Sequence, residues 1–295
     1  GQSFDSELTG DESLSRRPMQ RVSEPLSALG GVVETQPDGT PPLRIKGGRT
    51  LNGCHADLQI ASAQVKSAFL LAGLFAHGET SVTEPAPTRD HTERMLQGFG
   101  YAVERDNARL RLVGGGRLSA CHIDVPSDIS SAAFFLVAAS IVPESDLLIS
   151  HVGINPTRVG VLKILKLMGA NIEELNVRKV GGEPVADLRV RYAPLKGIDV
   201  PEGLVPLAID EFPILFVAAC IAEGRTRVTG AEELRVKESD RIQSMVNGLI
   251  TLGGSIEGTP DGAVICGGGP DFRFSGGVVE AHEDHRIAMA LSVAG

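Results

Sequence analysis

The residues best suited to chemistry are concentrated in the segment 233–241, which reads ELRVKESDR. Lys237 and Arg241 are four residues apart, with Glu238 between them, so a helix beginning there would place both cations on one face. Two cations at this spacing repel each other, and a purely structural helix normally avoids the arrangement. An anionic ligand held between the two cations would explain the spacing, and solvated surface charge is the alternative.

A pair of carboxylates, Asp210 and Glu211, precedes an apolar run that reads FPILFV. Acidic residues in the first turn of a helix are favoured by the helix dipole, so a structural explanation is available. A carboxylate at the rim of an apolar helix is also well placed to act as a general base. Both interpretations remain open for Asp210 at this stage.

A phosphate site is indicated where Ser62, Ala63 and Gln64 open a third segment, SAQVKSAFLLAGLFAHG. The unpaired backbone N–H groups of a helix start can hold a phosphate, and the Ser62 hydroxyl would add a further hydrogen bond. A serine that only caps its own helix accounts for the sequence equally well.

Three arginines lie at further predicted helix starts. Arg17 is in the segment 11–22, in which Ser15 could cap a helix and Pro18 suits an opening helical position. Arg89 and Arg286 open two later helices. Each arginine could be ordinary surface charge, but each would also bring a guanidinium to the positive end of a helix dipole, where anions bind.

These candidates occupy equivalent points of a pattern that recurs along the chain. One half-unit consists of a polar turn, an amphipathic helix, a glycine and a strand. The glycine stands where a helix needs a left-handed closing residue, which costs glycine least. Self-similarity at a long period indicates an architecture built from copies of one unit. The four glycines are Gly30, Gly100, Gly169 and Gly253.

The other half-unit is a helix rich in alanine, and the first three copies are followed by a short β-branched run. The pattern of strand, helix, strand, helix and extra strands predicts an α/β protein. The four helices are expected to begin near Ser62, Ser130, Asp210 and Asp284.

Composition excludes several classes of protein. The chain has 295 residues, 42% of them hydrophobic, and a mean hydropathy of +0.06, so it can form about two domains with substantial cores. Its apolar stretches are too short for a membrane span. A net charge of −9 with no basic stripe argues against a nucleic-acid partner.

Cysteine usage favours a reduced, cytoplasmic protein. Cys54, Cys121, Cys220 and Cys266 are scattered, without the spacing of a disulfide framework or of a metal site. We therefore expect four buried thiols and no bound metal.

Both ends of the sequence are expected to be incomplete. The chain begins at Gly1, and residues 3–9 read as a strand without the helix that should precede it. It stops at Gly295, within the fourth alanine-rich helix.

Six motifs in order resemble the family of 5-enolpyruvylshikimate-3-phosphate synthase (3-phosphoshikimate 1-carboxyvinyltransferase), and in particular its glyphosate-tolerant branch. The motifs are LTGDESLSRRPM, SAQVKSAFLLAGL, TRDHTE, IDEFPI, ELRVKESDR and HEDHRIAM. The resemblance implies a two-domain inside-out α/β barrel, each domain built from repeated βαβαββ units, with helix starts of both domains facing the cleft between them. The expected domains are residues 1–124, incomplete at the start, and 125–295, incomplete at the end.

The resemblance also implies roles for individual residues. Shikimate 3-phosphate would be held by Ser62, by the backbone of Ala63, by Gln64 and by Arg89, while Asp210 and Lys237 would contact its ring hydroxyls. Phosphoenolpyruvate would be held by Arg17, Arg241 and Arg286, with Gln64 nearby. The guanidinium groups suit these multiply anionic substrates because they can bind phosphates and carboxylates through two hydrogen bonds.

The implied reaction transfers the enolpyruvyl group of phosphoenolpyruvate to the 5-hydroxyl of shikimate 3-phosphate and releases phosphate. It belongs to the shikimate pathway, which leads to chorismate and the aromatic amino acids. Asp210 would be the general base and Lys237 or Glu238 the proton donor, without metal or organic cofactor. A monomer is expected, with these two small molecules as its partners and with neither nucleic acid nor membrane.

Three parts of the family pattern have no counterpart in this sequence. They are an N-terminal Lys-Ser…Arg segment, a Gly-Asn-x-x-Thr loop that discriminates against glyphosate, and a C-terminal Lys. The first two would precede Gly1 and the last would follow Gly295, so the 295-residue chain alone is expected to be weakly active or inactive.

Two alternatives belong beside this hypothesis. One is the related transferase that acts on UDP-N-acetylglucosamine, although none of the four cysteines lies in the reactive-cysteine loop of that enzyme. The other is a non-catalytic anion-binding domain that has kept the fold.

Overall fold

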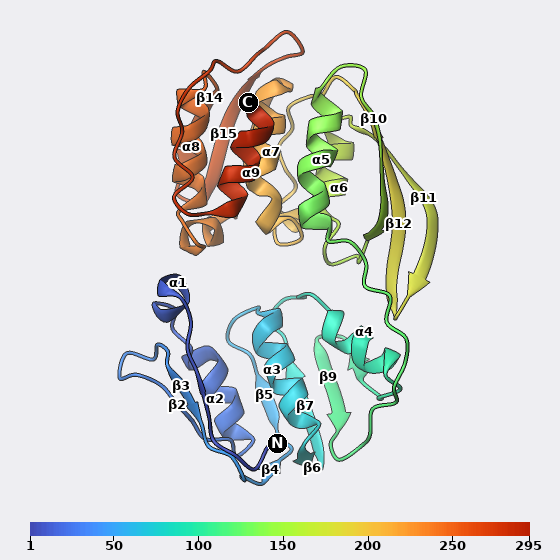
Figure 1. The fold of residues 1–295 in the computed structure, drawn as a ribbon, viewed down its shortest axis with the longest axis vertical. Coiled ribbons are helices and arrows are strands. Elements are labelled where there is room, and N and C mark those ends of the chain that lie inside the picture. Colours follow the sequence, from blue (N-terminus) through green and yellow to red (C-terminus); the bar gives the residue numbers. More distant parts are fainter. The chain divides into compact units, whose positions relative to one another are not determined.

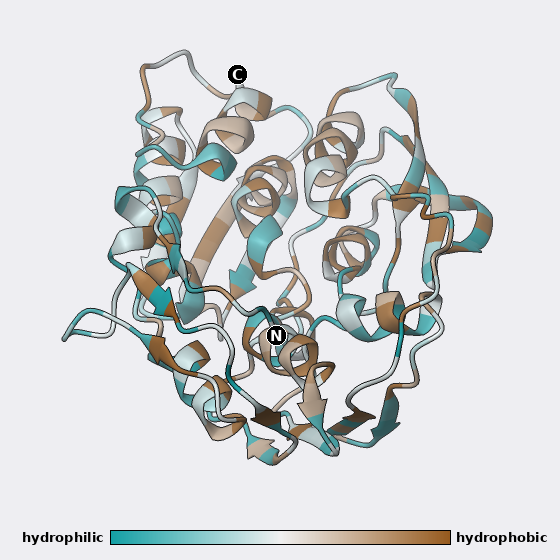
Figure 2. Ribbon diagram, turned by 60° about the horizontal axis from the view of Figure 1, so that its bottom comes forward, coloured by the Kyte–Doolittle hydropathy of each residue, from teal (hydrophilic) through white to brown (hydrophobic).

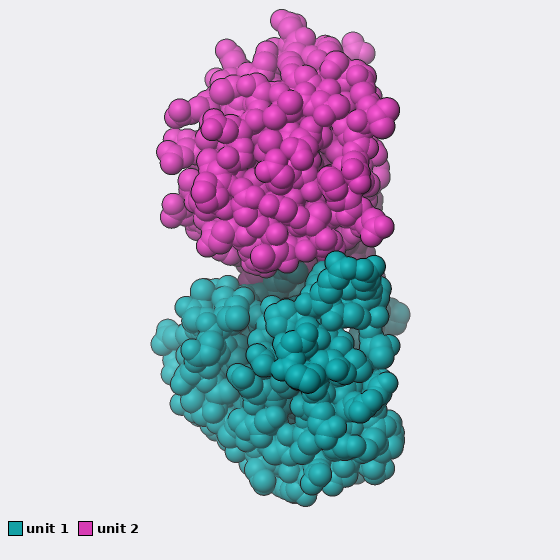
Figure 3. Space-filling model, turned by 90° about the vertical axis from the view of Figure 1, so that its left-hand side faces the viewer, with its two compact units in different colours: residues 1–123 teal, residues 124–295 magenta.

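The computed structural model describes all residues from Gly1 to Gly295 (Figure 1). The chain forms two compact units, unit 1 from Gly1 to Ile123 and unit 2 from Asp124 to Gly295 (Figure 3). Each unit has its own hydrophobic core. The core of unit 1 includes Phe69 and Leu110, and that of unit 2 includes Leu188 and Phe212.

One module occurs four times, twice in each unit. A strand is followed by a helix and a hairpin, and the second strand of the hairpin lies between the other two strands in the sheet. This shared order confirms the repeat expected from the sequence. The copies are β1 (Ser6–Leu8), α2 (Gln20–Ala28), β2 (Val33–Glu34) and β3 (Leu43–Ile45); β7 (Glu79–Thr83), α4 (His91–Gly98), β8 (Glu104–Asp106) and β9 (Arg109–Val113); β10 (Asp146–Gly153), α6 (Gly160–Leu167), β11 (Asn171–Val180) and β12 (Glu183–Arg191); and β13 (Glu223–Val228), α8 (Arg241–Thr251), β14 (Ser255–Thr259) and β15 (Gly262–Gly268).

Unit 1 also contains short strands outside the module, one of which extends a module sheet while two form a small sheet of their own. Strand β5 (His55–Asp57) pairs in parallel with β7, and β4 (Leu51–Asn52) pairs in parallel with β6 (Ala76–His77). A single helical turn, α1 (Glu12–Ser15), follows β1.

The alanine-rich helices are the second repeated feature. They are α3 (Ala63–Gly73), α5 (Ile129–Ile141), α7 (Phe212–Ile221) and α9 (His285–Ala294). Three begin after a side-chain cap, provided by Ser62, Asp128 and Asp284, since the cap accepts a hydrogen bond from an otherwise unpaired N–H group. In unit 2, α5, α7 and α9 pack against one another, as Figure 1 shows.

Helix α7 shows why small and apolar residues suit these positions. Nine of its ten residues are buried, and it contacts α5, α8, α9 and β15. Other helices carry both hydrophobic and hydrophilic residues (Figure 2). None of the helices is long and apolar enough to cross a membrane.

The glycines that end the four amphipathic helices have the left-handed backbone expected of them. Their φ angles are 95° at Gly30, 76° at Gly100, 96° at Gly169 and 85° at Gly253. A side chain at any of these positions would add strain. The amphipathic helix therefore ends in the same way, at a left-handed glycine, in every copy of the repeat.

The expectation of four buried thiols is wrong for two of them, Cys121 and Cys266, and Cys54 is only half-buried. Cys220 in α7 is buried, which raises the pKa of its thiol to about 12. Cys121 lies in the irregular segment that ends unit 1 and is exposed. Cys266 is also exposed, because it lies on the outward face of β15 between inward-facing neighbours.

Candidate functional site

Arg241 organises the largest group of candidate residues, all of them in unit 2. It is the first residue of α8, and only 1% of it is exposed. Its Nε lies 2.8 Å from Asp284 Oδ2 and its Nη1 lies 3.4 Å from Asp210 Oδ1. Its Nη2 donates to Glu238. One buried guanidinium thus joins three carboxylates, and we call Asp210, Lys237, Glu238, Arg241 and Asp284 the Arg241 cluster.

Lys237 joins this cluster by a different route from the one expected. Helix α8 begins only at Arg241, after its cap Asp240, and Lys237 has an extended backbone. The two cations therefore do not share a helix face, and that expectation is wrong. They meet at one carboxylate instead, because Lys237 Nζ lies 3.8 Å from the Asp210 oxygen that also faces Arg241.

Arg286 reaches the same region from the start of α9. Its Nη1 donates to the backbone oxygen of Asp210 at 3.2 Å and lies 4.0 Å from Glu211 Oε1. Its backbone N–H donates to the cap Asp284 at 2.9 Å. Asp284 therefore holds the starts of two helices, because it accepts hydrogen bonds from both Arg241 and Arg286.

Two buried carboxylates of this region have pKa values shifted in opposite directions. Burial raises the pKa of Asp284, but the hydrogen bond and positive charge of Arg241 outweigh it, so the pKa lies below its ordinary value. Burial dominates at Glu211, which is 2% exposed, and the hydrogen bond from Ser130 offsets it only partly, so its pKa is raised. Burial thus prevails at Glu211, whereas the direct hydrogen bond from Arg241 prevails at Asp284.

In unit 1, the candidate phosphate site lies at the start of α3. The Ser62 hydroxyl accepts a hydrogen bond from the backbone N–H of Val65 at 3.4 Å and caps the helix. Ala63 and Gln64 are the first two helical residues, and Gln64 is exposed. The capping interpretation of Ser62 is confirmed, and a cap hydroxyl at a helix start is compatible with holding an anion.

Arg89 lies on the turn before α4, and its backbone oxygen accepts a hydrogen bond from Lys66 of α3. The turn is thereby tied to the helix that begins at Ser62. The neighbouring Asp90 pairs with Arg94, one turn along α4.

Arg17 stands between two helices rather than at the start of one. Helix α1 is capped by Asp11, and α2 begins at Gln20, so neither Ser15 nor Pro18 has the expected role. The Nη2 atom of Arg17 lies 3.5 Å from the Ser13 hydroxyl. The local sequence forms an extra turn, α1, in which the Asp11 carboxylate accepts a hydrogen bond from the backbone N–H of Leu14.

The structure therefore brings the predicted residues together in two groups. Unit 2 gathers Asp210, Lys237, Glu238, Arg241 and Arg286. Unit 1 gathers Ser62, Ala63, Gln64 and, through Lys66, the turn of Arg89. Guanidinium and ammonium groups beside carboxylates can bind an anion and exchange a proton. No group of three His, Cys, Asp or Glu side chains is placed to hold a metal ion.

Three residues of these groups received no site role from the sequence: Asp284, Glu211 and Lys66. Asp284 could have been found from its position as a helix cap two residues before Arg286. Lys66 could have been found from its spacing, because it shares a helical face with the apolar residues Phe69 and Leu70. Neither the cap position of Asp284 nor the helical spacing of Lys66 identifies a functional residue from the sequence alone.

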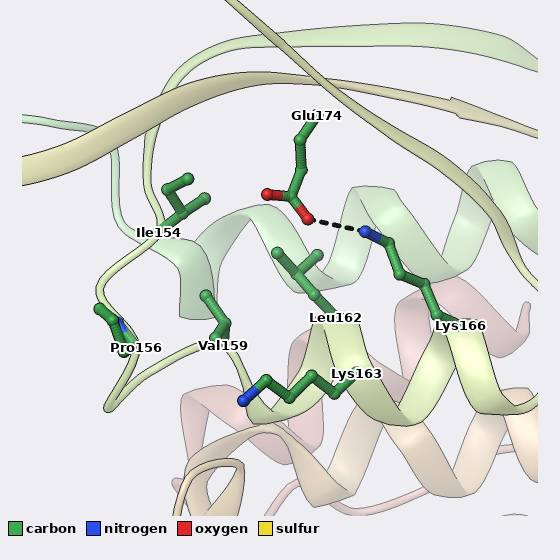
Figure 4. Close-up of a pocket in the computed structure, with 7 residues that line it drawn as sticks. All are labelled: Ile154, Pro156, Val159, Leu162, Lys163, Lys166 and Glu174. Carbon is green, nitrogen blue, oxygen red and sulfur yellow. Dashed lines mark hydrogen bonds and ion pairs between the residues drawn. The ribbon is translucent and has the colours of Figure 1, made fainter. Parts of the chain in front are cut away.

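A depression of about 290 Å³ in unit 2 lies apart from these residues (Figure 4). Its wall is largely apolar, and its Lys166 pairs with Glu174 at 2.6 Å. None of the candidate residues lines it, so it is not part of the candidate site. The lining residues are Ile154, Pro156, Val159, Leu162, Lys163, Lys166 and Glu174.

Comparison with known proteins gives one consistent result. The family profile of EPSP synthase (3-phosphoshikimate 1-carboxyvinyltransferase) matches residues 1–295. Curated proteins named 3-phosphoshikimate 1-carboxyvinyltransferase are similar over 294 residues, with 65% identity in Alkalilimnicola ehrlichii and 63% in Methylococcus capsulatus. All of this chain is covered, but only 65% and 66% of those proteins. The chain thus spans about two thirds of the length of its curated relatives.

A solved structure has the same fold as this chain. The EPSP synthase of Acinetobacter baumannii superimposes with a TM-score of 0.91 at 56% identity, over 99% of this chain and 67% of that one. The α/β fold of the enolpyruvyl transferase type, expected from the motifs, is confirmed. Its motifs, its repeated module and these matches show that the chain belongs to the EPSP synthase (3-phosphoshikimate 1-carboxyvinyltransferase) family.

Proposed function

We propose that the full-length protein transfers the enolpyruvyl group of phosphoenolpyruvate to the 5-hydroxyl of shikimate 3-phosphate. The observation that carries the proposal is the Asp210 carboxylate, which faces both Lys237 and Arg241 within 4 Å in a chain of this family. A carboxylate in such surroundings can accept a proton from a hydroxyl group while the cations hold an anionic partner.

Shikimate 3-phosphate is held, in this proposal, by the start of α3. Its phosphate accepts hydrogen bonds from the Ser62 hydroxyl, from the backbone N–H of Ala63 and from Gln64, and it pairs with Arg89. The start of a helix favours an anion because its N–H groups are unpaired and its dipole is positive. Asp210 and Lys237 contact the ring hydroxyls.

Phosphoenolpyruvate is held by three guanidinium groups, those of Arg17, Arg241 and Arg286, with Gln64 nearby. Arg241 is already positioned by Asp284, which fixes the direction of its planar group. Such a group can bind a carboxylate or a phosphate through two parallel hydrogen bonds, which lysine cannot do.

The reaction is an addition followed by an elimination. Asp210 takes the proton of the 5-hydroxyl as its oxygen bonds to the central carbon of phosphoenolpyruvate, and Lys237 or Glu238 delivers a proton to the methylene carbon. The resulting tetrahedral intermediate loses phosphate by cleavage of its C–O bond. Return of one methyl proton to the protein restores the double bond. Proton transfer by positioned side chains supports each step, and the scheme uses no metal or organic cofactor.

We further propose that the protein acts as a cytoplasmic monomer. The support for a reducing compartment is that the two exposed thiols, Cys121 and Cys266, are free. Cell fractionation and sedimentation of the full-length protein test the two parts separately.

The proposed function is tested by incubating the full-length protein with phosphoenolpyruvate and shikimate 3-phosphate. We expect release of phosphate that depends on shikimate 3-phosphate, together with an enolpyruvyl ether detected by mass spectrometry. Release with UDP-N-acetylglucosamine instead would favour the related transferase. Binding of shikimate 3-phosphate without turnover would favour a non-catalytic anion-binding domain.

A further inference from the structure

Lys66 is buried completely, although it lies on a helix of a small domain. Its ammonium group is surrounded by three oxygen atoms: the backbone oxygen of Arg89 at 2.9 Å, Glu93 Oε1 at 2.8 Å and Glu84 Oε1 at 3.1 Å. An ammonium group has three donor hydrogens, so this environment matches its full capacity. Burial of such a cation is tolerated only when it is paired in this way.

The surrounding charges form a closed set that we call the Lys66 cluster: Lys66, Glu84, Glu93 and Arg105. Arg105 Nη2 lies 3.0 Å from Glu84 and 3.3 Å from Glu93, so two cations balance two carboxylates. The members come from α3, from the end of β7, from α4 and from β8. The cluster therefore fastens four elements of unit 1 together.

A purely stabilising role explains this cluster poorly. Buried ion pairs contribute little net stability compared with apolar side chains of the same volume. The Oε2 atom of Glu93 is in addition buried without a hydrogen-bond partner, which costs free energy. The arrangement is better explained by the position that it imposes on the backbone.

The backbone fixed in this way is the turn of residues 84–89. Lys66 holds the oxygen of Arg89, while the Thr88 hydroxyl donates to Glu84. Lys66 lies only two residues beyond Gln64, and its backbone N–H donates to the oxygen of Ser62. One side chain therefore links the start of α3 to the turn that carries Arg89.

We propose that Lys66 is a positioning residue, which sets the Arg89 turn against the start of α3 so that both face one phosphate group. This inference rests on the proposed function, in which the phosphate of shikimate 3-phosphate binds there. Lys66 does not touch the substrate in this scheme. It acts through the Arg89 backbone, and its loss should weaken binding of shikimate 3-phosphate while leaving the KM for phosphoenolpyruvate unchanged.

The test compares variants of the full-length protein by isothermal titration with shikimate 3-phosphate. K66M alone leaves two buried carboxylates with one cation and can fail to fold, so the informative variant is K66M/E93Q, which removes one charge of each sign. E93Q by itself keeps the bond from Lys66 to Arg89. L110A removes part of the unit 1 core beside Arg105 without removing a charge of the cluster or the bond from Lys66 to Arg89, and it controls for lost stability.

We expect the dissociation constant of K66M/E93Q to rise about tenfold or more above that of E93Q, because a small displacement of a binding group is sufficient for such a loss. L110A should bind as the wild type does. Equal affinity of folded K66M/E93Q and E93Q would overturn the inference while leaving the proposed function intact. A wild-type protein that does not bind shikimate 3-phosphate would refute the proposed function itself.

Discussion

The two charged clusters of this molecule are both built from a buried cation and its carboxylate partners, but they have different proposed roles. In the Lys66 cluster of unit 1, a buried ammonium is enclosed by oxygen atoms of the protein, and the side chains of Lys66 and Glu84 are almost completely hidden. In the Arg241 cluster of unit 2, the central guanidinium is equally buried, but Lys237, Asp210 and Glu238 remain partly exposed, by 21%, 15% and 35%. In the Lys66 cluster only Arg105 is accessible, with 40% of its side chain exposed, whereas in the Arg241 cluster carboxylates and an ammonium group are accessible, as proton transfer to a ligand requires.

The comparison also explains why the repeat is useful. In each unit, an alanine-rich helix or the turn before it meets charged residues of the module that follows: Lys66 of α3 pairs with Glu93 of α4, and Asp210 before α7 faces Arg241 of α8. Where the charges are turned inward, as at Lys66, they fix the turn. Where one face remains accessible, as at Asp210, the same arrangement can hold a ligand.

Removal of the Asp210 carboxylate should have the largest effect. We expect D210N to lower kcat between about a hundredfold and ten thousandfold, the usual contribution of a general base, and to retain binding of shikimate 3-phosphate. The amide oxygen can still accept from Arg241, so the fold should persist. D146N, which removes a carboxylate that pairs with Arg189 at an exposed strand, should change kcat by less than about twofold. A D210N enzyme of normal kcat would exclude Asp210 as the base.

The central cation of each cluster should be equally important for stability. K66M and R241M should each lower the free energy of unfolding by about 3–5 kcal/mol, because each leaves buried carboxylates without their partner. Urea denaturation followed by circular dichroism measures the loss, and added salt should change it little, since the pairs are shielded from solvent. A loss below about 1 kcal/mol for either variant would show that its cluster is not desolvated as described.

The two buried carboxylates of unit 2, Asp284 and Glu211, should make the stability of the protein depend on pH in opposite directions. The pKa of Asp284 is lowered on folding, so its contribution to stability is present above its ordinary value of 3.8 and is lost as the pH falls through the folded-state pKa. The pKa of Glu211 is raised, so stability falls as the pH rises above its ordinary value of 4.5 towards the folded-state pKa.

Denaturation at a series of pH values separates these effects. D284N should flatten the loss of stability at the acid end, and E211Q should flatten the loss that begins above pH 4.5. If E211Q instead steepened the decline on the alkaline side, the assigned direction of the Glu211 shift would be incorrect.

The smallest predicted effects concern two hydroxyl groups of helix α3, that of its cap Ser62 and that of Ser67. S62A removes the cap and should lower the free energy of unfolding by about 1 kcal/mol, and it should also weaken shikimate 3-phosphate binding. S67A removes a hydroxyl that lies 2.7 Å from that of Thr92, and a similar loss of stability of about 1 kcal/mol is expected. Calorimetry should find altered affinity only for S62A. Equal affinities of both variants would place the phosphate elsewhere.

The sequence was a good guide to features that depend on neighbouring residues. The caps Ser62 and Asp284 and the closing glycines follow from local backbone chemistry, and the structure has them where they were expected. The position of Lys237 was inferred incorrectly because Asp240, a strong cap next to Arg241, starts the helix later.

Features that depend on distant residues could not be predicted. The Lys66 cluster joins side chains of residues 66, 84, 93 and 105, and no spacing in the sequence indicates that they meet. Similarly, Arg241 and Asp284 are 43 residues apart, and only the packing of α8 against α9 brings them within 2.8 Å. Tertiary packing, rather than local propensity, decides which charged residues become buried.

The most direct test of the proposed site is a crystal structure of the full-length protein with shikimate 3-phosphate bound. We predict that the phosphate oxygens lie within hydrogen-bond distance, about 3 Å, of the Ser62 hydroxyl, with the Arg89 guanidinium beside them and the 5-hydroxyl facing Asp210. Density for the substrate at any place away from Ser62 and Asp210 would contradict the assignment of these helix starts as the site of the reaction.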